Sequence, residues 1–277
     1  MNGERMRLKK AIVPPAWRRS GGMNPQADLI HATEDGEFEL VYQPAIDLAG
    51  GRILGWEALV RWHHPLRGVV SPAEFIPAAE KTGAILTIGE WILNRACEDF
   101  AQVLSLGEAV AWVSVNVSTQ ELEQVDFADT VRHALSQSGV EPSSLVLEIT
   151  EAAVVEGAGS IGDALVSLRG DGVRIALDDF GSVSSSLDHL EQLPVDILKI
   201  DRTVTTMSGA EQAGILEAIV ALGKKLGLGM IAEGIEESTE LERIRDFEGV
   251  AGQGYFLARP MSLDDARTFT FKSLPAR

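Results

Sequence analysis

The chain has 277 residues, of which 45% are hydrophobic and 23% charged, and its formal net charge is −17. This length and hydrophobic content are enough to bury a full core, and one large α/β domain accounts for nearly all of the chain. Residues 1–24 hold six basic residues and one acid, which leaves 18 basic and 40 acidic residues in the remainder. So acidic a body disfavours nonspecific binding to nucleic acid, and any anionic substrate would need cations to offset the repulsion.

The N-terminal segment and the single cysteine bear on where the protein resides, and the cysteine content fits a reducing compartment. Residues 1–24 are rich in Arg, Pro and Gly, which predicts a flexible leader or linker ahead of a domain over residues 25–277. No apolar run reaches the ~18 residues that span a bilayer, and Pro14 and Pro15 interrupt the leader, so we expect neither a membrane span nor a signal peptide. Cys97 is the single cysteine, which excludes an internal disulfide. We expect a cytoplasmic protein, or the cytosolic portion of a membrane-anchored parent.

The first two predicted strands form a hairpin. The stretches FELVYQPAIDL and RILGWEALVRW flank a short AGG link, which is too short for the crossover that a parallel pair requires. The two strands are therefore expected to be antiparallel. With residues 49–51 as the loop, Leu48 faces Arg52 and Gln43 faces Glu57. An acid on this otherwise apolar strand is more typical of a ligand that lines a cavity than of a structural position.

Helices and strands alternate along the rest of the chain. The predicted strands are AWVSVNVS, LVLEIT, VRIALDD, VDILKID, LGMIAEGIE and VAGQGYF. A short helix is predicted from Pro72 toward Lys81, and a longer amphipathic helix follows it and ends near Leu104. Further helices are predicted from Gln120 to Ser138, from about Ile161, from Ala210 to Leu226, and across Glu240 to Phe247. Together with the hairpin this gives about eight strands, the number found in a β/α barrel.

Polar side chains stand near the end of nearly every predicted strand. They are Asn116, Glu148, Asp178, Asp179, Lys199, Asp201, Glu233, Glu236 and Gln253. Because barrel strands end at one face, these side chains are expected to converge on an active site. Adjacent aspartates raise each other's pKa and are costly unless a cation lies between them. The pair Asp178 and Asp179 therefore predicts a metal site, against the alternative that Asp179 only caps a following helix.

The motifs between about Phe38 and Pro260 resemble, in order and spacing, those of the EAL-type phosphodiesterases. They read YQP, GWEALVRW, FIPAAE, VNVS, LEITE, DDFG, PVDILKIDR, IAEGIE and QGYFLARP. The resemblance implies an α/β fold, a modified TIM (β/α)8 barrel with one antiparallel strand. It further implies that two metal ions, Mg²⁺ or Mn²⁺, activate a water that hydrolyses the bacterial second messenger cyclic di-GMP to linear pGpG. A homodimer, and a sensor or regulatory domain in a longer parent chain, are also implied.

The resemblance implies a role for each of the candidate site residues. One ion would be bound by Glu57, Asn116, Glu148 and Asp178, and the other by Asp178, Asp179 and Glu233. The catalytic set implied by the family is Lys199, Glu233, Asp201 and Glu236, with Lys199 orienting the water. The substrate contacts implied by the family are Gln43, Leu59, Arg61 and Gln253. Oxygen ligands without cysteine suit Mg²⁺ or Mn²⁺ better than zinc, whereas the larger Ca²⁺ is expected to inhibit.

One loop departs from the family pattern. The chain reads DDFGSVSSSL, so that Val183 and Ser184 stand where the family usually has a glycine and an aromatic residue. In the family this loop helps to form the dimer, and it is anchored by the acid corresponding to Glu151, which is retained. A valine resists a backbone position that needs positive φ. A cyclic di-GMP receptor without turnover, with an altered loop at Ser182 to Ser184, is therefore the alternative, and an unrelated barrel enzyme is the next.

Overall fold

The structure is a computed structural model that describes residues 25–104, 110–150, 153, 160–181, 194–206 and 210–271. The predicted leader over residues 1–24 lies outside the described residues. Glu151 and the loop from Ser182 to Ser184 also lie outside them, so the expectations about the loop and its anchor stay predictions.

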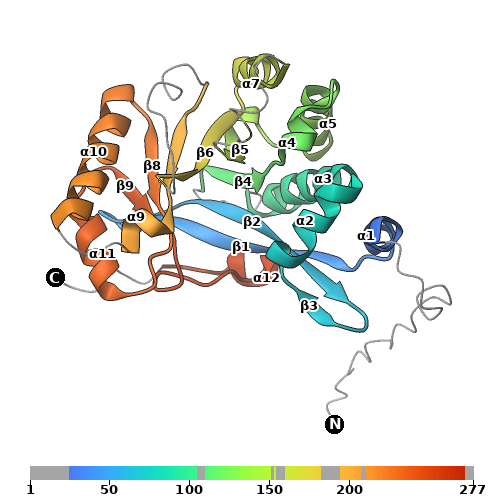
Figure 1. Cartoon of the computed structure of the whole chain (residues 1–277), viewed down its shortest axis with the longest axis horizontal. Coiled ribbons are helices and arrows are strands. Elements are labelled where there is room, and N and C mark those ends of the chain that lie inside the picture. The colour runs from blue at the N-terminus through green and yellow to red at the C-terminus, as the bar shows by residue number, and fades with distance from the viewer. Residues whose placement is uncertain are drawn as a thin grey trace, which may run out of the picture.

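The strands form one sheet that closes on itself (Figure 1). Of its nine strands, β3 (Gly68–Val70) is joined within the described residues to β2 alone, which leaves eight strands in the ring. In ring order they are β1 (Phe38–Asp47), β9 (Val250–Gly252), β8 (Gly229–Ala232), β7 (Ile197–Ile200), β6 (Arg174–Phe180), β5 (Leu145–Thr150), β4 (Trp112–Asn116) and β2 (Ile53–His64). β1 runs antiparallel to both of its neighbours, while the other neighbours in the ring are parallel. The predicted barrel with one antiparallel strand is confirmed.

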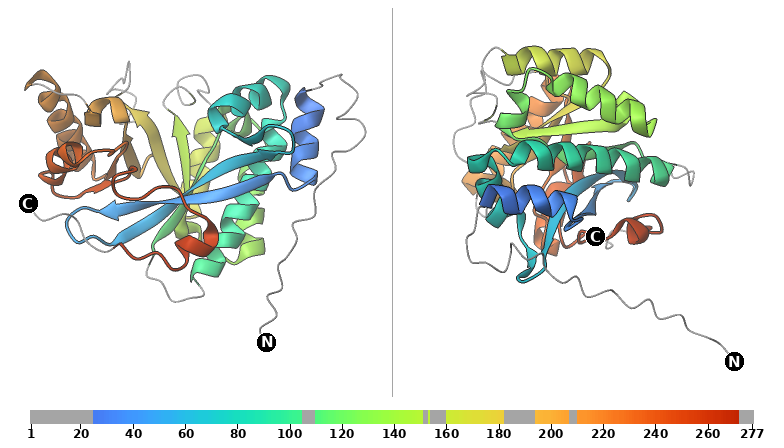
Figure 2. Two further views of the ribbon diagram at one scale, coloured as in Figure 1. Left: turned by 90° about the horizontal axis from the view of Figure 1, so that it is seen from below. Right: turned by 90° about the vertical axis from the view of Figure 1, so that its right-hand side faces the viewer.

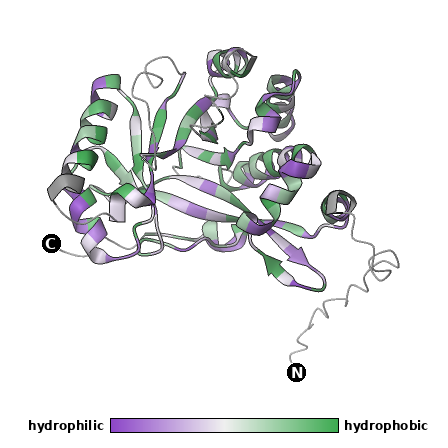
Figure 3. Ribbon diagram, in the orientation of Figure 1, coloured by the Kyte–Doolittle hydropathy of each residue, from purple (hydrophilic) through white to green (hydrophobic). Residues whose placement is uncertain are grey.

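Helices cover the outside of the ring (Figure 2). They are α1 (Pro25–Glu34), α2 (Pro72–Thr82), α3 (Ile85–Leu104), α4 (Thr119–Leu122), α5 (Phe127–Ser138), the short 3₁₀ helix η2 (Pro142–Ser144), α7 (Ser160–Gly170), α9 (Arg202–Thr206), α10 (Ala210–Leu226), α11 (Ser238–Arg245) and α12 (Leu263–Ala266). Strands and helices carry many apolar residues (Figure 3), and Phe100, Leu165 and Val220 are buried in the main core. Burial of this apolar surface is the dominant favourable term in holding the helices on the ring.

A second, smaller core fills the inside of the barrel. It is made of Ala45, Trp112, Val146, Ala176, Ile197, Ile231 and Ala251, which come from seven different strands. Because side chains alternate between the two faces of a strand, residues two positions away from these also point inward. The inner core therefore fixes which side chains line the two ends of the barrel.

The β1–β2 hairpin confirms the predicted pairing of Gln43 with Glu57. The predicted pairing of Leu48 with Arg52 is wrong, because the turn closes one residue earlier. The N–H of Asp47 donates to the carbonyl oxygen of Arg52 at 2.8 Å. A bulge at Leu54 in β2, just after the turn, absorbs the offset of one residue, so the pairs farther from the turn keep the predicted register.

The single helix predicted over residues 120 to 138 is also wrong. The structure has two helices there, α4 and α5. Leu122 and Phe127 are both buried while Val125 between them is fully exposed, which one continuous helix does not allow at this spacing. The other predicted helices and strands are present, whereas α1, α9, α12 and β3 were not predicted.

A buried acid fixes the start of α4 directly after β4. The Oε2 atom of Glu121 accepts hydrogen bonds from the N–H and the hydroxyl of Ser118, at 2.9 and 2.6 Å. The backbone of α3 makes room for this acid at Gly89, where a Cβ would lie 1.8 Å from Oε1 of Glu121. Burial raises the pKa of Glu121 to about 7, although the bonds from Ser118 oppose the rise. This capping box therefore carries a cost that depends on pH.

We expect Glu121→Gln to remove part of the pH dependence of stability. The pKa of about 7 in the folded state lies above the ordinary value of 4.5, so ionisation of Glu121 penalises the folded state as the pH rises from 4.5 through 7. Glutamine keeps an acceptor for Ser118 and has no charge. The variant should gain on the order of 2–3 kcal/mol relative to wild type between about pH 5 and pH 8. Urea unfolding at both pH values measures this, and a difference that stays constant with pH would contradict it.

Candidate functional site

Five strands deliver a polar side chain into the mouth of the barrel by the same step. Each of these polar residues lies two positions after a residue of the inner core. The five residues are Glu148, Asp178, Lys199, Glu233 and Gln253. β1 is antiparallel, so its polar residue Gln43 instead lies two positions before the inner-core residue Ala45. The alternation of strand side chains thus brings residues from distant parts of the chain to one site.

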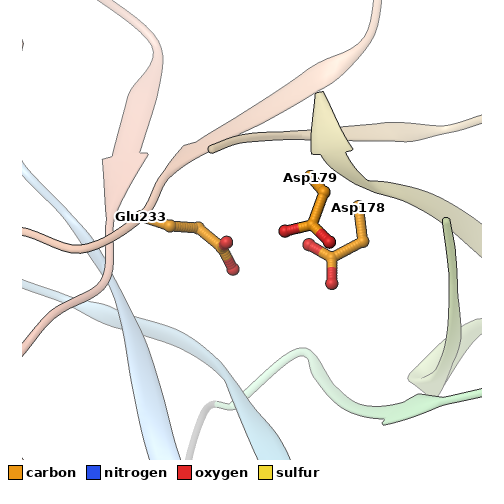
Figure 4. A group of neighbouring side chains, drawn as sticks. All are labelled: Asp178, Asp179 and Glu233. Carbon is orange, nitrogen blue, oxygen red and sulfur yellow. The ribbon is translucent and has the colours of Figure 1, made fainter. Parts of the chain in front are cut away.

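Asp178 and Asp179 both turn toward the site because β6 is irregular at its end. Neighbouring residues of a regular strand point to opposite faces. Here the register with β7 shifts between Leu177 and Phe180, and Asp179 has a φ of 57°, the only positive value of a non-glycine residue in the described ranges. Carboxylate oxygens of Asp178, Asp179 and Glu233 consequently all lie within 4.8 Å of one another (Figure 4). Such bulges often re-aim side chains beside active sites.

The ammonium group of Lys199 lies at the centre of the acidic cluster and is only 1% exposed. Its Nζ atom is 2.5 Å from Glu148, 2.7 Å from Glu233, 3.3 Å from Asp178 and 3.5 Å from Glu57. One buried lysine therefore balances four carboxylates, which leaves an excess of negative charge in the barrel mouth.

Two amides hold Glu57 in one orientation. Asn116 Nδ2 donates to Oε1 at 2.9 Å, and Gln253 Nε2 donates to Oε2 at 2.6 Å. Gln253 also reaches Oε1 of Gln43 at 3.5 Å, and Gln43 Nε2 donates to the carbonyl oxygen of Ala258 at 3.0 Å. Asn116, the exposed last residue of the otherwise buried strand β4, thus has Glu57 as the partner of its amide.

The pKa values of the cluster diverge. Burial would raise the pKa of Glu57, but the charge of Lys199 and the two amide bonds outweigh it and lower that pKa. Burial and the charge of Glu57 raise the pKa of Glu148 well above its usual range. The pKa of Glu233 rises to about 7 through burial, opposed by Lys199, and that of Asp179 rises through burial and its neighbour Asp178. Lys199 alone therefore does not compensate the full ionisation of the cluster, which a bound cation would favour.

These residues fit a hard divalent cation. The Oδ1 atom of Asp178 is buried and accepts no hydrogen bond within the described residues, although Lys199 lies 3.3 Å from it. At that distance the pair attracts by charge but leaves a lone pair of the oxygen for another partner. The atoms of the cluster that could bind a metal are carboxylate and amide oxygens, which are the ligands that Mg²⁺ and Mn²⁺ prefer. The cluster Asp178, Asp179 and Glu233 could therefore hold a metal ion.

The remaining predicted residues lie around this cluster. Asp201 accepts a hydrogen bond from the N–H of Thr203 at 2.8 Å, which caps α9, and its charge also raises the pKa of Asp179. Glu236 accepts a hydrogen bond from Arg202 at 2.7 Å. Leu59 and Arg61 follow Glu57 on the same face of β2 and are partly buried, and Arg61 donates to the carbonyl oxygen of Val60.

An open cleft of about 240 Å³ leads to the cluster. Five of its lining residues are predicted site residues: Gln43, Glu57, Glu233, Glu236 and Gln253. The other four lie within the family motifs but were assigned no role: Arg202, Gly234, Gly254 and Tyr255. Arg202 packs on Gly234, whose φ is 67° and where a Cβ would lie 2.4 Å from the Arg202 side chain. Arg202 is the last residue of the motif PVDILKIDR, which was the sequence signal for it.

A model of the EAL domain family matches residues 26–260 of this chain. The chain belongs to the EAL domain family. The resemblance read from the sequence motifs is thereby confirmed. Among the relatives of this EAL chain, the bifunctional diguanylate cyclase/cyclic di-GMP phosphodiesterase MucR of Pseudomonas aeruginosa is 40% identical over 236 residues, which cover 84% of this chain and 34% of MucR. The cyclic di-GMP phosphodiesterase NbdA of the same organism is 37% identical over 264 residues, 93% of this chain and 34% of NbdA.

Solved EAL structures share the fold. The structure of the PaMucR phosphodiesterase in complex with c-di-GMP has a TM-score of 0.83 and 39% identity, and the match covers 88% of this chain and all of that one, 100%. The FimX EAL domain from Pseudomonas aeruginosa bound to c-di-GMP has a TM-score of 0.75 and 26% identity over 86% of this chain and 97% of that one. This EAL chain spans about a third of the length of the curated relatives it matches. None of the helices in its described part combines the length and apolar character needed to cross a membrane.

Proposed function

We propose that this chain hydrolyses cyclic di-GMP to linear pGpG with two divalent cations, Mg²⁺ or Mn²⁺. The observation that carries the proposal is the convergence of Glu57, Glu148, Asp178, Asp179 and Glu233 around Lys199 at the mouth of an EAL barrel. The names of the relatives MucR and NbdA and the c-di-GMP complexes of PaMucR and FimX support the substrate.

The chain would bind the cations through two sets of ligands. The first set is Glu57, Asn116, Glu148 and Asp178, and the second is Asp178, Asp179 and Glu233. When bound, the ions would supply an acidified water and positive charge against the phosphate. The excess negative charge of the cluster and the free lone pair of Asp178 Oδ1 support this assignment.

The other residues would bind the substrate and position the water. The ammonium of Lys199 would hold the attacking water and offset charge that develops on the phosphate. Gln43 and Gln253 lie beside Glu57 and line the cleft, so their amides would contact the bound nucleotide. Leu59 would contact it from β2, where the planar fork of Arg61 would donate to a phosphate. Asp201 and Glu236 would act indirectly, by fixing α9 and Arg202.

The setting of the domain in the cell is also a proposal. Relatives about three times as long support a sensor or regulatory domain in a longer parent protein. We propose a cytoplasmic location, because cyclic di-GMP is a messenger of the bacterial interior. We also propose that the chain forms a homodimer through the loop after β6.

Metal exchange tests the proposal. We expect excess EDTA to abolish hydrolysis, and Mg²⁺ or Mn²⁺ to restore it. Ca²⁺ should not restore it, because this larger ion binds carboxylates in a loose geometry that does not fix the attack. Mass spectrometry of the products and calorimetry of cyclic di-GMP binding check both steps. Undiminished hydrolysis in EDTA would contradict the metal mechanism, and tight binding without pGpG in Mn²⁺ would identify a receptor instead.

A further inference from the structure

A second pocket lies at the end of β6 opposite the acidic cluster. It has a volume of about 490 Å³ and is lined by the end of α7, the start of β6 and the segment before β7: Val166, Arg169, Gly170, Gly172, Val173, Arg174, Pro194 and Asp196. We call it the basal pocket. Its volume lies within the range of about 300–1,000 Å³ that is usual for small-ligand sites.

Arg174 brings to this pocket a buried hydrogen-bond donor without an acceptor in the described part of the chain. Arg174 lies two positions before the inner-core residue Ala176, so its side chain enters the barrel from the basal end. Its guanidinium lies 6.0 Å from the ring centroid of Trp112. Its Nε is buried and has no hydrogen-bond partner within the described residues. A buried donor of a cation without an acceptor is costly, which indicates that an acceptor is missing.

The one acid of the pocket is already engaged. The carboxylate of Asp196 accepts hydrogen bonds from Arg169 Nε at 2.9 Å and from the backbone N–H of Ile175 at 3.0 Å. Burial lowers the pKa of Arg174 although the charge of Asp196 opposes this, so that acid does not fully compensate the guanidinium. Two arginines against one acid leave the basal pocket positive in a strongly acidic protein.

The end of α7 does not cancel this positive charge. Carbonyl oxygens at a helix C-terminus repel an anion when they are free. Here the carbonyl oxygens of Ser167, Leu168 and Arg169 accept hydrogen bonds from the backbone N–H groups of residues 171 to 173. Asp171 in turn pairs with Arg132 at 2.7 Å. Among the described residues, the charged groups that line the pocket are therefore the two arginines and Asp196, which leaves it net positive.

We propose that the basal pocket is a second binding site, which takes the phosphate or carboxylate group of a small anionic ligand. An oxyanion would accept a hydrogen bond from Nε of Arg174 once a shift of the side chain exposes this buried atom to the pocket. Arg169, whose side chain is 49% exposed, would close over the ligand from the rim. The planar fork of arginine suits two oxygens of one group.

Titration of the full-length chain with inorganic phosphate and with acetate tests the site, in metal-free buffer at constant ionic strength. The readout is the ¹⁵Nε–¹Hε resonance of Arg174, assigned by its loss in Arg174→Lys. We expect a saturable shift with a Kd of about 1 mM or tighter for at least one anion. A stronger response to phosphate identifies a phosphorylated ligand, and a stronger response to acetate identifies a carboxylate.

Variants separate the basal pocket from general charge effects. Arg169→Gln, at the exposed rim, should weaken binding at least tenfold, and the matched control Arg67→Gln on the remote β2–β3 turn should not change it. Arg174→Gln should abolish the protection that the anion gives against thermal unfolding. The proposal is overturned by a shift that does not saturate with either anion. Equal affinities of wild type and Arg169→Gln, together with unchanged thermal protection in Arg174→Gln, would overturn it as well.

Discussion

Replacing Glu57 by alanine should lower the rate of cyclic di-GMP hydrolysis on the order of a thousandfold or more. The carboxylate of Glu57 is fixed by Asn116 and Gln253 and lies 3.5 Å from Lys199. Its loss removes one ligand of the proposed first ion and takes this acceptor from the amides of Asn116 and Gln253, of which Gln253 keeps the longer contact with Gln43. Quantification of pGpG gives the rate, and calorimetry with Mn²⁺ gives the loss of metal affinity.

Two controls make the Glu57 result specific. Glu57→Gln keeps the shape and an acceptor oxygen, so it should preserve thermal stability while it still loses most of the metal affinity. Glu74→Ala removes an exposed acid that pairs with Arg67, and it should leave the rate unchanged. If Glu57→Ala stayed within tenfold of the wild-type rate, the ligand assignment on β2 would be wrong.

Lys199→Met should destabilise the metal-free protein by about 3–5 kcal/mol, because it leaves buried carboxylates without their cation. Glu148, Glu233, Asp178 and Glu57 all lie within 3.5 Å of the ammonium. Mn²⁺ should restore much of this loss by supplying positive charge to the same oxygens, whereas the hydrolysis rate should stay low. Thermal unfolding in EDTA and in Mn²⁺ measures both parts.

The pH dependence gives an independent check on Lys199→Met. Without the lysine, the pKa values of the buried acids in the folded state rise further, and their ionisation penalises the folded state more as the pH increases. The loss of stability should therefore be larger at about pH 8 than at about pH 6. Lys225→Met on the exposed side of α10 is the matched control, and it should change neither the stability nor its dependence on pH. Equal stability of Lys199→Met and wild type in EDTA would show that the lysine does not compensate the cluster.

The barrel and the strand-end cluster could be predicted from the sequence because both follow from periodicity. Alternation along each strand places Glu148, Asp178 and Lys199 inward once the inner core is known, and the short AGG link makes β1 antiparallel. The pairing of Gln43 with Glu57 followed from the same counting. Recognition of the family motifs added the roles of these residues, which periodicity alone does not give.

Other features depend on local backbone geometry that no pattern encodes. The bulge at Leu54 in β2 moved the hairpin turn by one residue, so the predicted pairing of Leu48 with Arg52 was wrong. The break between α4 and α5 depends on which side chains are buried in the core: Leu122 and Phe127 are buried, whereas Val125 is exposed. The close packing of Glu121 against Gly89 joins residues that are far apart in sequence, so the sequence pattern around either residue does not predict the contact.

The left-handed backbone of Asp179 means that folding and metal binding make opposite demands on one residue. Aspartate tolerates a φ of 57° better than most residues, but glycine adopts it without strain and brings no buried charge. A library of variants selected only for resistance to heat should therefore enrich glycine at position 179 and lose the second cation. Selection for turnover should keep aspartate there and accept a less stable fold.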